Sequence, residues 1–260
     1  MMSQEFGEWC VPIVTGIISS SIFASISYLI YFCHKQYVKR IDKWFWDNFY
    51  KKNINIIFRE YKIDVSTAEE EIANSIGDGY QVSKGMALSI GRLVSYLQHG
   101  VTSNNQIKTQ GDQTNTFDVN TEVPICLGSK NNIMTKTILD RVSAVFSFPF
   151  DTGWDNEEKR ICITHKTEKY TPNIKDGNGT DYALIVNVLL DSGPVLIIAG
   201  AHMWGTQGAV EAITNKHWLK EIRKRFLGKK NIALVLKFEI NENRPHVREI
   251  IQAVQLGRIL

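Results

Sequence analysis

The sequence predicts an α/β protein in three parts: a single N-terminal transmembrane helix, a helical connector, and a C-terminal three-layer domain. The first observation is an uncharged apolar run near the N-terminus. The second is a set of amphipathic helical patterns after it, and the third is an alternation of apolar strands and helices from about residue 120. We expect the divisions to fall at residues 1–33, 34–119 and 120–260, with a mixed sheet that ends in a β-hairpin.

The composition excludes several classes of protein. The 260 residues are 43% hydrophobic and 22% charged, which is close to globular averages and excludes wholesale disorder and a multi-span membrane protein. The net charge of +3 is too small to imply nucleic-acid binding by itself. The four cysteines lie far apart, with no histidine at metal-ligand spacing, so we expect neither a metal site nor a bound cofactor.

The apolar run Val11–Cys33 contains no charged residue and is long enough, as a helix, to cross a hydrocarbon core of roughly 30 Å. Only Glu5 and Glu8 carry charge before it, whereas Lys and Arg residues follow it closely. The positive-inside rule therefore places the N-terminus outside and the C-terminal domain on the cytoplasmic side of the inner (plasma) membrane. The alternative is a cleaved signal peptide, which would need a basic leader and a shorter apolar core.

Small residues recur along one face of this predicted span. They lie at steps of four, four and three, as Gly16, Ser20, Ala24 and Ser27. Such stripes allow close approach of helices in lipid, and hydroxyl groups can bond across them, so we expect a homo-oligomer. The alternative is that serine is simply tolerated in a single span. A ring of these helices could line a pore, but the sequence does not require one.

The connector is expected to be mostly helical. Apolar residues at helical spacing predict a juxtamembrane helix over 34–62, whose basic residues either contact acidic headgroups or form a solvated face. A capping-box pattern predicts a helix over 68–76, and a second amphipathic pattern predicts one over 84–98 that ends at Gly100. The polar stretch 101–120 is expected to be a long loop or a partly ordered link.

The C-terminal part alternates apolar runs with helical patterns, which predicts parallel central strands with antiparallel strands added at an edge. We expect helices over 132–145, 205–212 and 217–226. We expect strands over 123–127, 182–190, 195–200 and 232–240, a final strand over 247–256, and a small hairpin from 161–164 and 169–171.

Two strand-to-helix junctions share one plan, in which an apolar strand ends at a glycine and a helix begins after small polar residues. Helix N-termini attract phosphates, and ligands of α/β sheets bind beyond the carboxyl ends of parallel strands. If the two strands are neighbours, their junctions form one crevice. Alternatively, the glycines are ordinary turn residues and the threonine is a helix cap, because neither junction matches GxGxxG or the P-loop. The candidate ligand-binding residues are Gly128, Ser129, Asn131, Gly200, His202, Trp204, Gly205 and Thr206.

Other residues near these junctions leave alternatives open. Trp204 could stack on a nucleobase or belong to the core, and His202 could be a general base or a phosphate donor. Asp181 could hold a ribose hydroxyl or simply end a turn. The basic run 216–230 could be a solvated face, or it could contact phosphates, nucleic acid or the inner leaflet. No Ser–His–Asp set and no GxSxG elbow is present, so we assign no catalytic residue.

The order of anchor, helix, polar linker and Rossmann-like domain resembles small membrane effectors of prokaryotic defence systems. Residues 120–256 also look like Rossmann-like domains with a strand–GS–x–N junction (Gly128, Ser129 and Asn131) and a later strand–G–xxx–GT junction (Gly200, Gly205 and Thr206). The resemblance implies a cytosolic domain that reads a nucleotide or short oligonucleotide messenger made by a partner enzyme. It also implies that an oligomer of anchors disrupts the inner membrane or opens an ion channel in antiviral defence.

The leading hypothesis is therefore a non-enzymatic, oligomeric sensor and effector that binds a phosphate-bearing ligand. The alternative is a membrane-tethered hydrolase, a nucleotide hydrolase or a glycosidase, that acts on a nucleotide-like substrate in the same crevice. A third hypothesis is a scaffold whose glycine junctions bind nothing. An enzyme would need a convergent acid and base in the crevice, and the local sequence offers only His202.

Overall fold

The computed structural model describes residues 26–32, 43–49, 52–59, 61–62, 80–81, 83–100, 107–112 and 122–259. The chain divides into two units, Met1–Lys43 and Trp44–Leu260.

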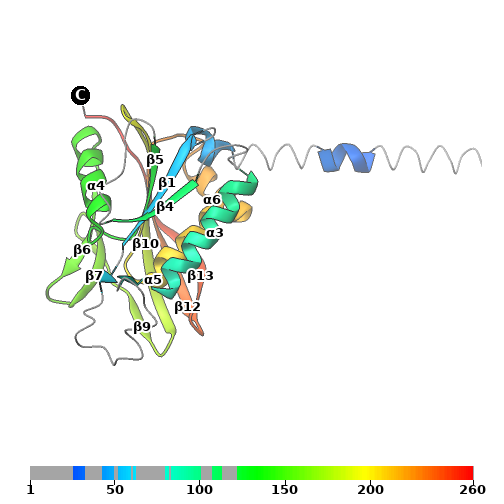
Figure 1. Cartoon of the computed structure of the whole chain (residues 1–260). Coiled ribbons are helices and arrows are strands. Elements are labelled where there is room, and N and C mark those ends of the chain that lie inside the picture. Colours follow the sequence, from blue (N-terminus) through cyan, green and yellow to red (C-terminus); the bar gives the residue numbers. More distant parts are fainter. Residues whose placement is uncertain are drawn as a thin grey trace, which may run out of the picture. The chain divides into compact units, whose positions relative to one another are not determined.

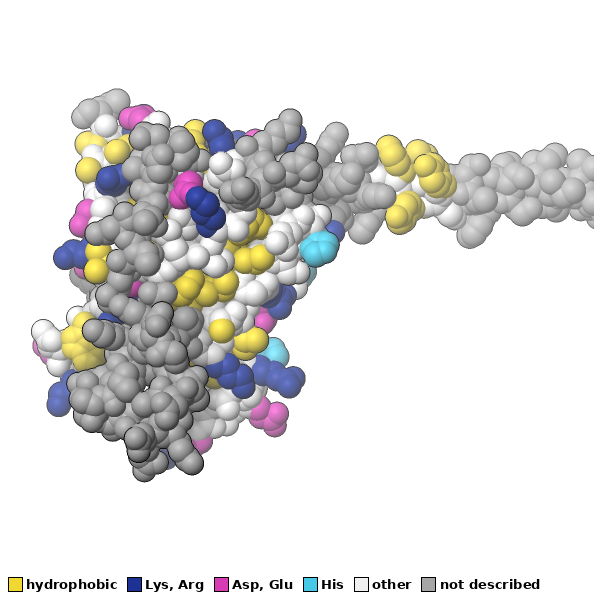
Figure 2. Space-filling view, viewed as in Figure 1, with side chains coloured by type: hydrophobic (Ala, Val, Ile, Leu, Met, Phe, Trp, Pro, Cys, Tyr) yellow, Lys and Arg dark blue, Asp and Glu magenta, His cyan; other side chains and the backbone are white. Residues whose placement is uncertain are grey.

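The described part of the first unit contains a short helix, residues 26–32, with exposed apolar side chains (Figure 2). Most of the predicted span Val11–Cys33 lies outside the described residues, as do Gly16, Ser20 and Ala24 of the predicted oligomer face. Ser27 is described and is exposed. Within the described ranges, no helix is both long enough and apolar enough to cross a membrane. The transmembrane helix and its oligomer therefore stay predictions.

The second unit has the predicted α/β fold, built on an eight-stranded mixed sheet (Figure 1). The strand order is β13-β12-β10-β11-β5-β1-β4, with β9 added beside β10. Strands β4, β1, β5 and β11 run parallel, whereas β9, β10, β12 and β13 form antiparallel pairs. The bounds are β1 Asn53–Phe58, β4 Ile107–Gly111, β5 Glu122–Leu127, β9 Asn173–Lys175, β10 Asn178–Leu190, β11 Gly193–Gly200, β12 Ile232–Asn241 and β13 Arg244–Gln255.

Helices cover both faces of the main sheet, which gives three layers (Figure 1). Helix α4, Ile133–Val145, lies on one face, and its N-cap residue Asn132 accepts a hydrogen bond from the amide of Thr135 at 2.9 Å. The other face carries the remaining helices, α3 Lys84–Gly100, α5 Met203–Ile213 and α6 Lys216–Arg225. The helices expected over 84–98, 132–145, 205–212 and 217–226 are thus confirmed, as are the five expected strands and the terminal hairpin β12–β13.

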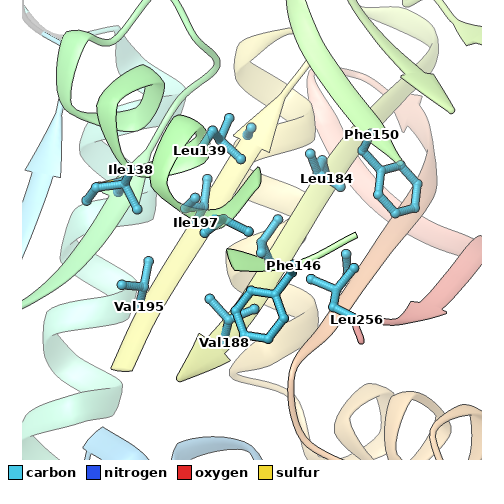
Figure 3. Close-up of a cluster of buried hydrophobic side chains, with 14 of the residues drawn as sticks. Ile138, Leu139, Phe146, Phe150, Leu184, Val188, Val195, Ile197 and Leu256 are labelled. Carbon is cyan, nitrogen blue, oxygen red and sulfur yellow. The ribbon is translucent and has the colours of Figure 1, made fainter. Parts of the chain in front are cut away.

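The core beneath α4 joins that helix to the sheet and to the C-terminal segment (Figure 3). Ile138 and Leu139 of α4 face Ile197 of β11 and Leu184 of β10, and Leu256 closes the cluster from the end of the chain. All of these side chains are at most 3% exposed. Because each fully buried aliphatic side chain contributes roughly 1.5–3 kcal/mol, this cluster fixes α4 on its face of the sheet.

Two smaller sheets accompany the main one. The predicted hairpin of 161–164 with 169–171 is confirmed as β7 with β8, and a strand that was not predicted, β6, precedes them. The three strands are β6 Phe150–Asp155, β7 Arg160–His165 and β8 Glu168–Tyr170. A second pair consists of β2 Tyr61–Lys62 and β3 Tyr80–Gln81. The helix predicted over 68–76 lies outside the described residues.

One prediction for the connector is wrong, and a second is decided between its two alternatives. The helix expected over 34–62 is interrupted by strand β1, which is buried between β4 and β5. The strand was missed because the polar residue Asn55 lies within it. The side-chain Nδ2 of this buried residue donates to the carboxylate of Glu122 at 2.7 Å. Of the two alternatives for 101–120, the partly ordered link fits, because this stretch contains β4, an edge strand whose polar residues suit its exposed side. The functional division of the chain at residue 120 stays a prediction, although 107–111 pair directly with β1.

The beginning of the second unit is anchored by aromatic side chains. Phe45, Trp46 and Phe49 are each at most 2% exposed, and η1, a 3₁₀ turn over Asp47–Phe49, holds them together. The indole of Trp46 donates to the carbonyl of Ile213 at 3.3 Å. Residues from the predicted connector therefore belong to the core of the sheet domain.

Replacing the buried indole tests this conclusion. We expect Trp46→Ala to lower the free energy of unfolding by about 3–5 kcal/mol, because it empties a large core site and orphans a carbonyl. Denaturant unfolding measures the change, with Trp154→Ala as the matched control, since Trp154 is 57% exposed. If both variants lose less than about 1 kcal/mol, the aromatic segment is not part of the core.

Candidate functional site

The two strands that end at the glycine junctions are neighbours in the sheet, which is the condition for the predicted crevice. Strand β11 pairs in parallel with β5, and the amide of Gly128 continues the ladder by donating to the carbonyl of Ile198 at 2.8 Å. The helix after β5 covers one face of the sheet, and the helix after β11 covers the other (Figure 1). The two loops diverge at this point, which is where open α/β sheets form ligand crevices.

A cavity of about 350 Å³ opens at this edge, within the usual size range of small-molecule sites. Six of the eight predicted ligand-binding residues line it, whereas Trp204 and Gly205 are buried in α5 and are not among its lining residues. The six are Gly128, Ser129, Asn131, Gly200, His202 and Thr206.

The charged residues that line the cavity were not predicted from the sequence, and those that the structure describes are all basic. Arg59 follows β1, so a third parallel strand delivers a residue to the same edge. Lys159 lies in the turn between β6 and β7, and Arg160 is the first residue of β7; both line the cavity with the exposed residue Trp154. The sequence signal for Arg59 is its position directly after an apolar strand. This signal was missed because β1 itself was not predicted.

Trp204 is not available to stack on a ligand, because it is buried in the first turn of α5 at 4% exposure. The core interpretation of this residue is therefore correct. Trp154, with its ring exposed at the cavity, is the aromatic side chain that a base could stack upon.

The N-terminus of α5 already holds a carboxylate from inside the protein. Oδ1 of the fully buried Asp181 accepts from the amide of His202 at 3.1 Å, and Oδ2 accepts from the amide of Gly205. Asp181 therefore neither binds a ribose nor merely ends a turn. Because it occupies the amides that a phosphate would need, this helix end is a weaker anion site than the sequence suggested.

Burial raises the pKa of Asp181 from 3.8 to about 7, against the lowering effect of the backbone amides that it accepts from. Partial desolvation also lowers the pKa of His202 below its usual value of 6.5. The imidazole is therefore mostly neutral at pH 7 and presents one donor and one acceptor to the cavity.

Glycine is required at two of the predicted positions for close packing. A Cβ on Gly205 would lie 2.3 Å from the carbonyl oxygen of Tyr182, and one on Gly200 would lie 2.3 Å from the amide of Thr206. The hydroxyl of Thr206 accepts from the amide of Gly200 at 3.2 Å, so it ties α5 to β11. These residues shape the floor of the cavity by holding helix and strand together.

The N-terminus of α4 is capped in a similar way. Asp112, at the end of β4, accepts from the amide of Ile133 at 3.1 Å, and Asn132 caps the next turn. The hydroxyl of Ser129 is nearly buried and lies 3.4 Å from the amide of Asn131. Both junctions therefore satisfy much of their backbone internally, and the basic side chains provide the positive charge of the cavity.

The described residues offer little for metal or acid–base chemistry. Among them, no group of three His, Cys, Asp or Glu side chains could hold a metal ion. No carboxylate is among the described residues that line the cavity, and His202 is its only imidazole there. The two described cysteines are buried, and burial raises the pKa of both thiols.

Comparison with known proteins provides no family: no family model, no curated protein and no solved structure matches this chain. The fold and the cavity are thus the basis for a functional proposal.

The cap formed by Asp181 predicts a specific pH dependence of stability. Since the pKa of Asp181 is higher in the folded state than in the unfolded chain, ionisation opposes folding, and stability falls as the pH rises toward 7. Between pH 5 and pH 8, the free energy of unfolding should therefore fall in the wild type by about 3 kcal/mol more than in Asp181→Asn. Denaturant unfolding at both values measures this, with Asp176→Asn as an exposed control. An unchanged pH dependence in Asp181→Asn would contradict the assignment.

Proposed function

We propose that the protein is a membrane-anchored, oligomeric effector whose cytosolic α/β unit binds a nucleotide or short oligonucleotide. Ligand binding would control membrane disruption or channel opening, in the manner of the prokaryotic antiviral effectors that its domain order resembles. The observation that carries the ligand proposal is the cavity at the ends of β1, β5 and β11. Among the described residues that line it, the charged ones are all basic, and an exposed Trp lies beside them.

The chemistry of the cavity supports a ligand with phosphates and a flat ring. Arg59, Lys159 and Arg160 can neutralise phosphate oxygens, while Trp154 offers a stacking surface. A volume of about 350 Å³ suits one nucleotide, or one nucleotide of a longer ligand. Neutral His202 supplies a hydrogen bond to a base or a sugar rather than a charge.

The arrangement favours binding over hydrolysis. Hydrolysis of a nucleotide-like substrate needs a positioned general base and an acid or a metal ion. Of the described lining residues, His202 is the one imidazole, and desolvation lowers its pKa. The buried acid Asp181 is engaged with backbone amides. The membrane-tethered hydrolase therefore remains the second candidate.

The membrane part of the proposal rests on the sequence of Val11–Cys33 and on its small-residue face. The described end of that segment is helical, with exposed apolar side chains from Ile26 to Phe32, which suits a lipid environment. A single-pass orientation with the N-terminus outside would place the cavity in the cytoplasm, where a partner enzyme would make the ligand.

The ligand proposal predicts that nucleotide-like molecules co-purify with the full chain. We expect mass spectrometry of the heat-released fraction to find one, and we expect Trp154→Ala to weaken its binding by about 5- to 150-fold because base stacking is lost. Lys159→Glu should weaken binding as well, through repulsion of phosphate.

The matched control is Lys136→Glu, which makes the same charge change on the exposed side of α4. Calorimetric titration of the released ligand compares the variants. If Lys136→Glu and Lys159→Glu bind equally well, the cavity is not the ligand site.

The anchor proposal predicts that the small-residue face is needed for assembly. We expect Ser20→Lys to abolish oligomers in detergent and to remove any growth defect caused by expression, because a charge at a packed helix interface in lipid is costly. Cross-linking and growth assays measure the two effects, with Ile22→Lys as a control for charge alone. A wild-type chain that is strictly monomeric would rule out the oligomeric effector.

A further inference from the structure

A strongly basic surface with an apolar tip lies at the C-terminal end of α6. Leu227 is 85% exposed and takes a positive φ of 49°, so its side chain projects from the turn that follows the helix. Exposure of so much apolar surface to water is unfavourable in free energy. We call this surface the basic corner, which consists of Arg223, Lys224, Arg225, Leu227, Lys229 and Lys230.

The basic corner lies where the chain enters the second unit. The indole of Trp44, the first residue of that unit, donates to the carbonyl of Gly228 at 2.7 Å. Lys230 also forms an ion pair with Asp47 at 3.0 Å. The corner is therefore tied directly to the segment that follows the predicted membrane span.

The charge of the corner is only partly compensated. Glu221 pairs with Lys224 at 2.7 Å, and Asp47 pairs with Lys230. For Arg225 and Lys229, which are exposed, the described part of the chain records no ion pair. The five basic residues of the corner thus leave an excess of positive charge around an apolar side chain.

We propose that the basic corner rests on an anionic membrane surface, with Leu227 among the headgroups and the basic side chains on lipid phosphates. This inference rests on the proposed function, because it takes Val11–Cys33 to be the span. Residues 34–43 separate Cys33 from Trp44, and ten residues reach at most about 35 Å even when fully extended. The corner is thus held within reach of the cytoplasmic leaflet.

The combination of groups favours lipid over nucleic acid. A nucleic-acid backbone would attract the basic residues equally, but it would leave the side chain of Leu227 in water. A bilayer surface accommodates both, because apolar side chains enter the interface while Lys and Arg contact acidic headgroups. Docking would also fix the orientation of the cavity relative to the membrane.

The test uses the full chain, added to neutral phosphatidylcholine vesicles and to vesicles with three-tenths phosphatidylglycerol. Flotation reports membrane attachment, and hydrogen exchange of residues 223–230 reports docking of the corner. We expect flotation with both vesicles, and exchange at the corner at least tenfold slower on the anionic ones. The double variant Arg225→Glu with Lys229→Glu should lose this protection, since each basic residue contributes about fivefold to the affinity for an anionic membrane surface.

The matched control is Lys136→Glu with Lys166→Glu, which makes the same charge change at exposed sites elsewhere and should keep the protection. Leu227→Ser should lose part of it, whereas Ile133→Ser, at a side chain that is 60% exposed, should not. If the chain floats with both vesicles but residues 223–230 exchange equally fast on both, the docking proposal is wrong and the anchor proposal is unaffected.

Failure to float with neutral vesicles contradicts the anchor instead. Docking is then decided by flotation with anionic vesicles, where dependence on Arg225 and Lys229 supports it and absence of flotation overturns it. If a short duplex oligonucleotide protects residues 223–230 more strongly than anionic vesicles do, the corner is a nucleic-acid site and the lipid proposal is wrong.

Discussion

The parallel pairing of β5 with β11 is the contact on which both the fold and the candidate site depend. It joins the parallel half of the main sheet, β4, β1 and β5, to the antiparallel half that begins with β11 and β10. It also sets side by side two strands whose following helices go to opposite faces of the sheet. A crevice between diverging loops is the geometric consequence, and its position does not depend on the identity of any ligand.

The carboxylate of Asp181 changes how that crevice can work. By accepting from the amides of His202 and Gly205, it neutralises the helix end that a sequence pattern would assign to phosphate. Positive charge then comes from Arg59 and from the β6–β7 hairpin, which Lys130 ties to the first junction through Asp151 at 2.7 Å. In the proposed function, a ligand would therefore bias the position of a hairpin rather than fill a rigid loop.

The sequence predicted the C-terminal elements well because their patterns are local. Apolar runs such as 195–200 and amphipathic runs such as 84–98 can be recognised from the local sequence alone. Strand β1 was missed because Asn55 is polar but internally paired, and β4 was missed because an edge strand can be polar. The basic lining of the cavity depends on which strand ends and which hairpin meet in space, so no local pattern contains it. Trp204 and Trp154 show this most plainly, since only packing decides which of the two is exposed.

Helix α3 physically connects the cavity to the beginning of the second unit. Met86, in its first turn, lines the cavity, while Tyr96, near its other end, packs its ring 5.7 Å from that of Trp46. The ten residue steps from Met86 to Tyr96 span about 15 Å of helix, and between them Arg92 pairs with Glu211 of α5 at 3.4 Å. A signal from ligand to membrane needs an element that both sites contact, and the differential affinity of the ligand for two positions of that element sets the strength of the coupling. Helix α3 touches the cavity at one end and the aromatic anchor of the entry segment at the other, so it meets the first of these requirements. A Cβ added to Gly85 would lie only 3.1 Å from the carbonyl oxygen of Met203, and this close packing links a displacement of α3 to the N-terminus of α5.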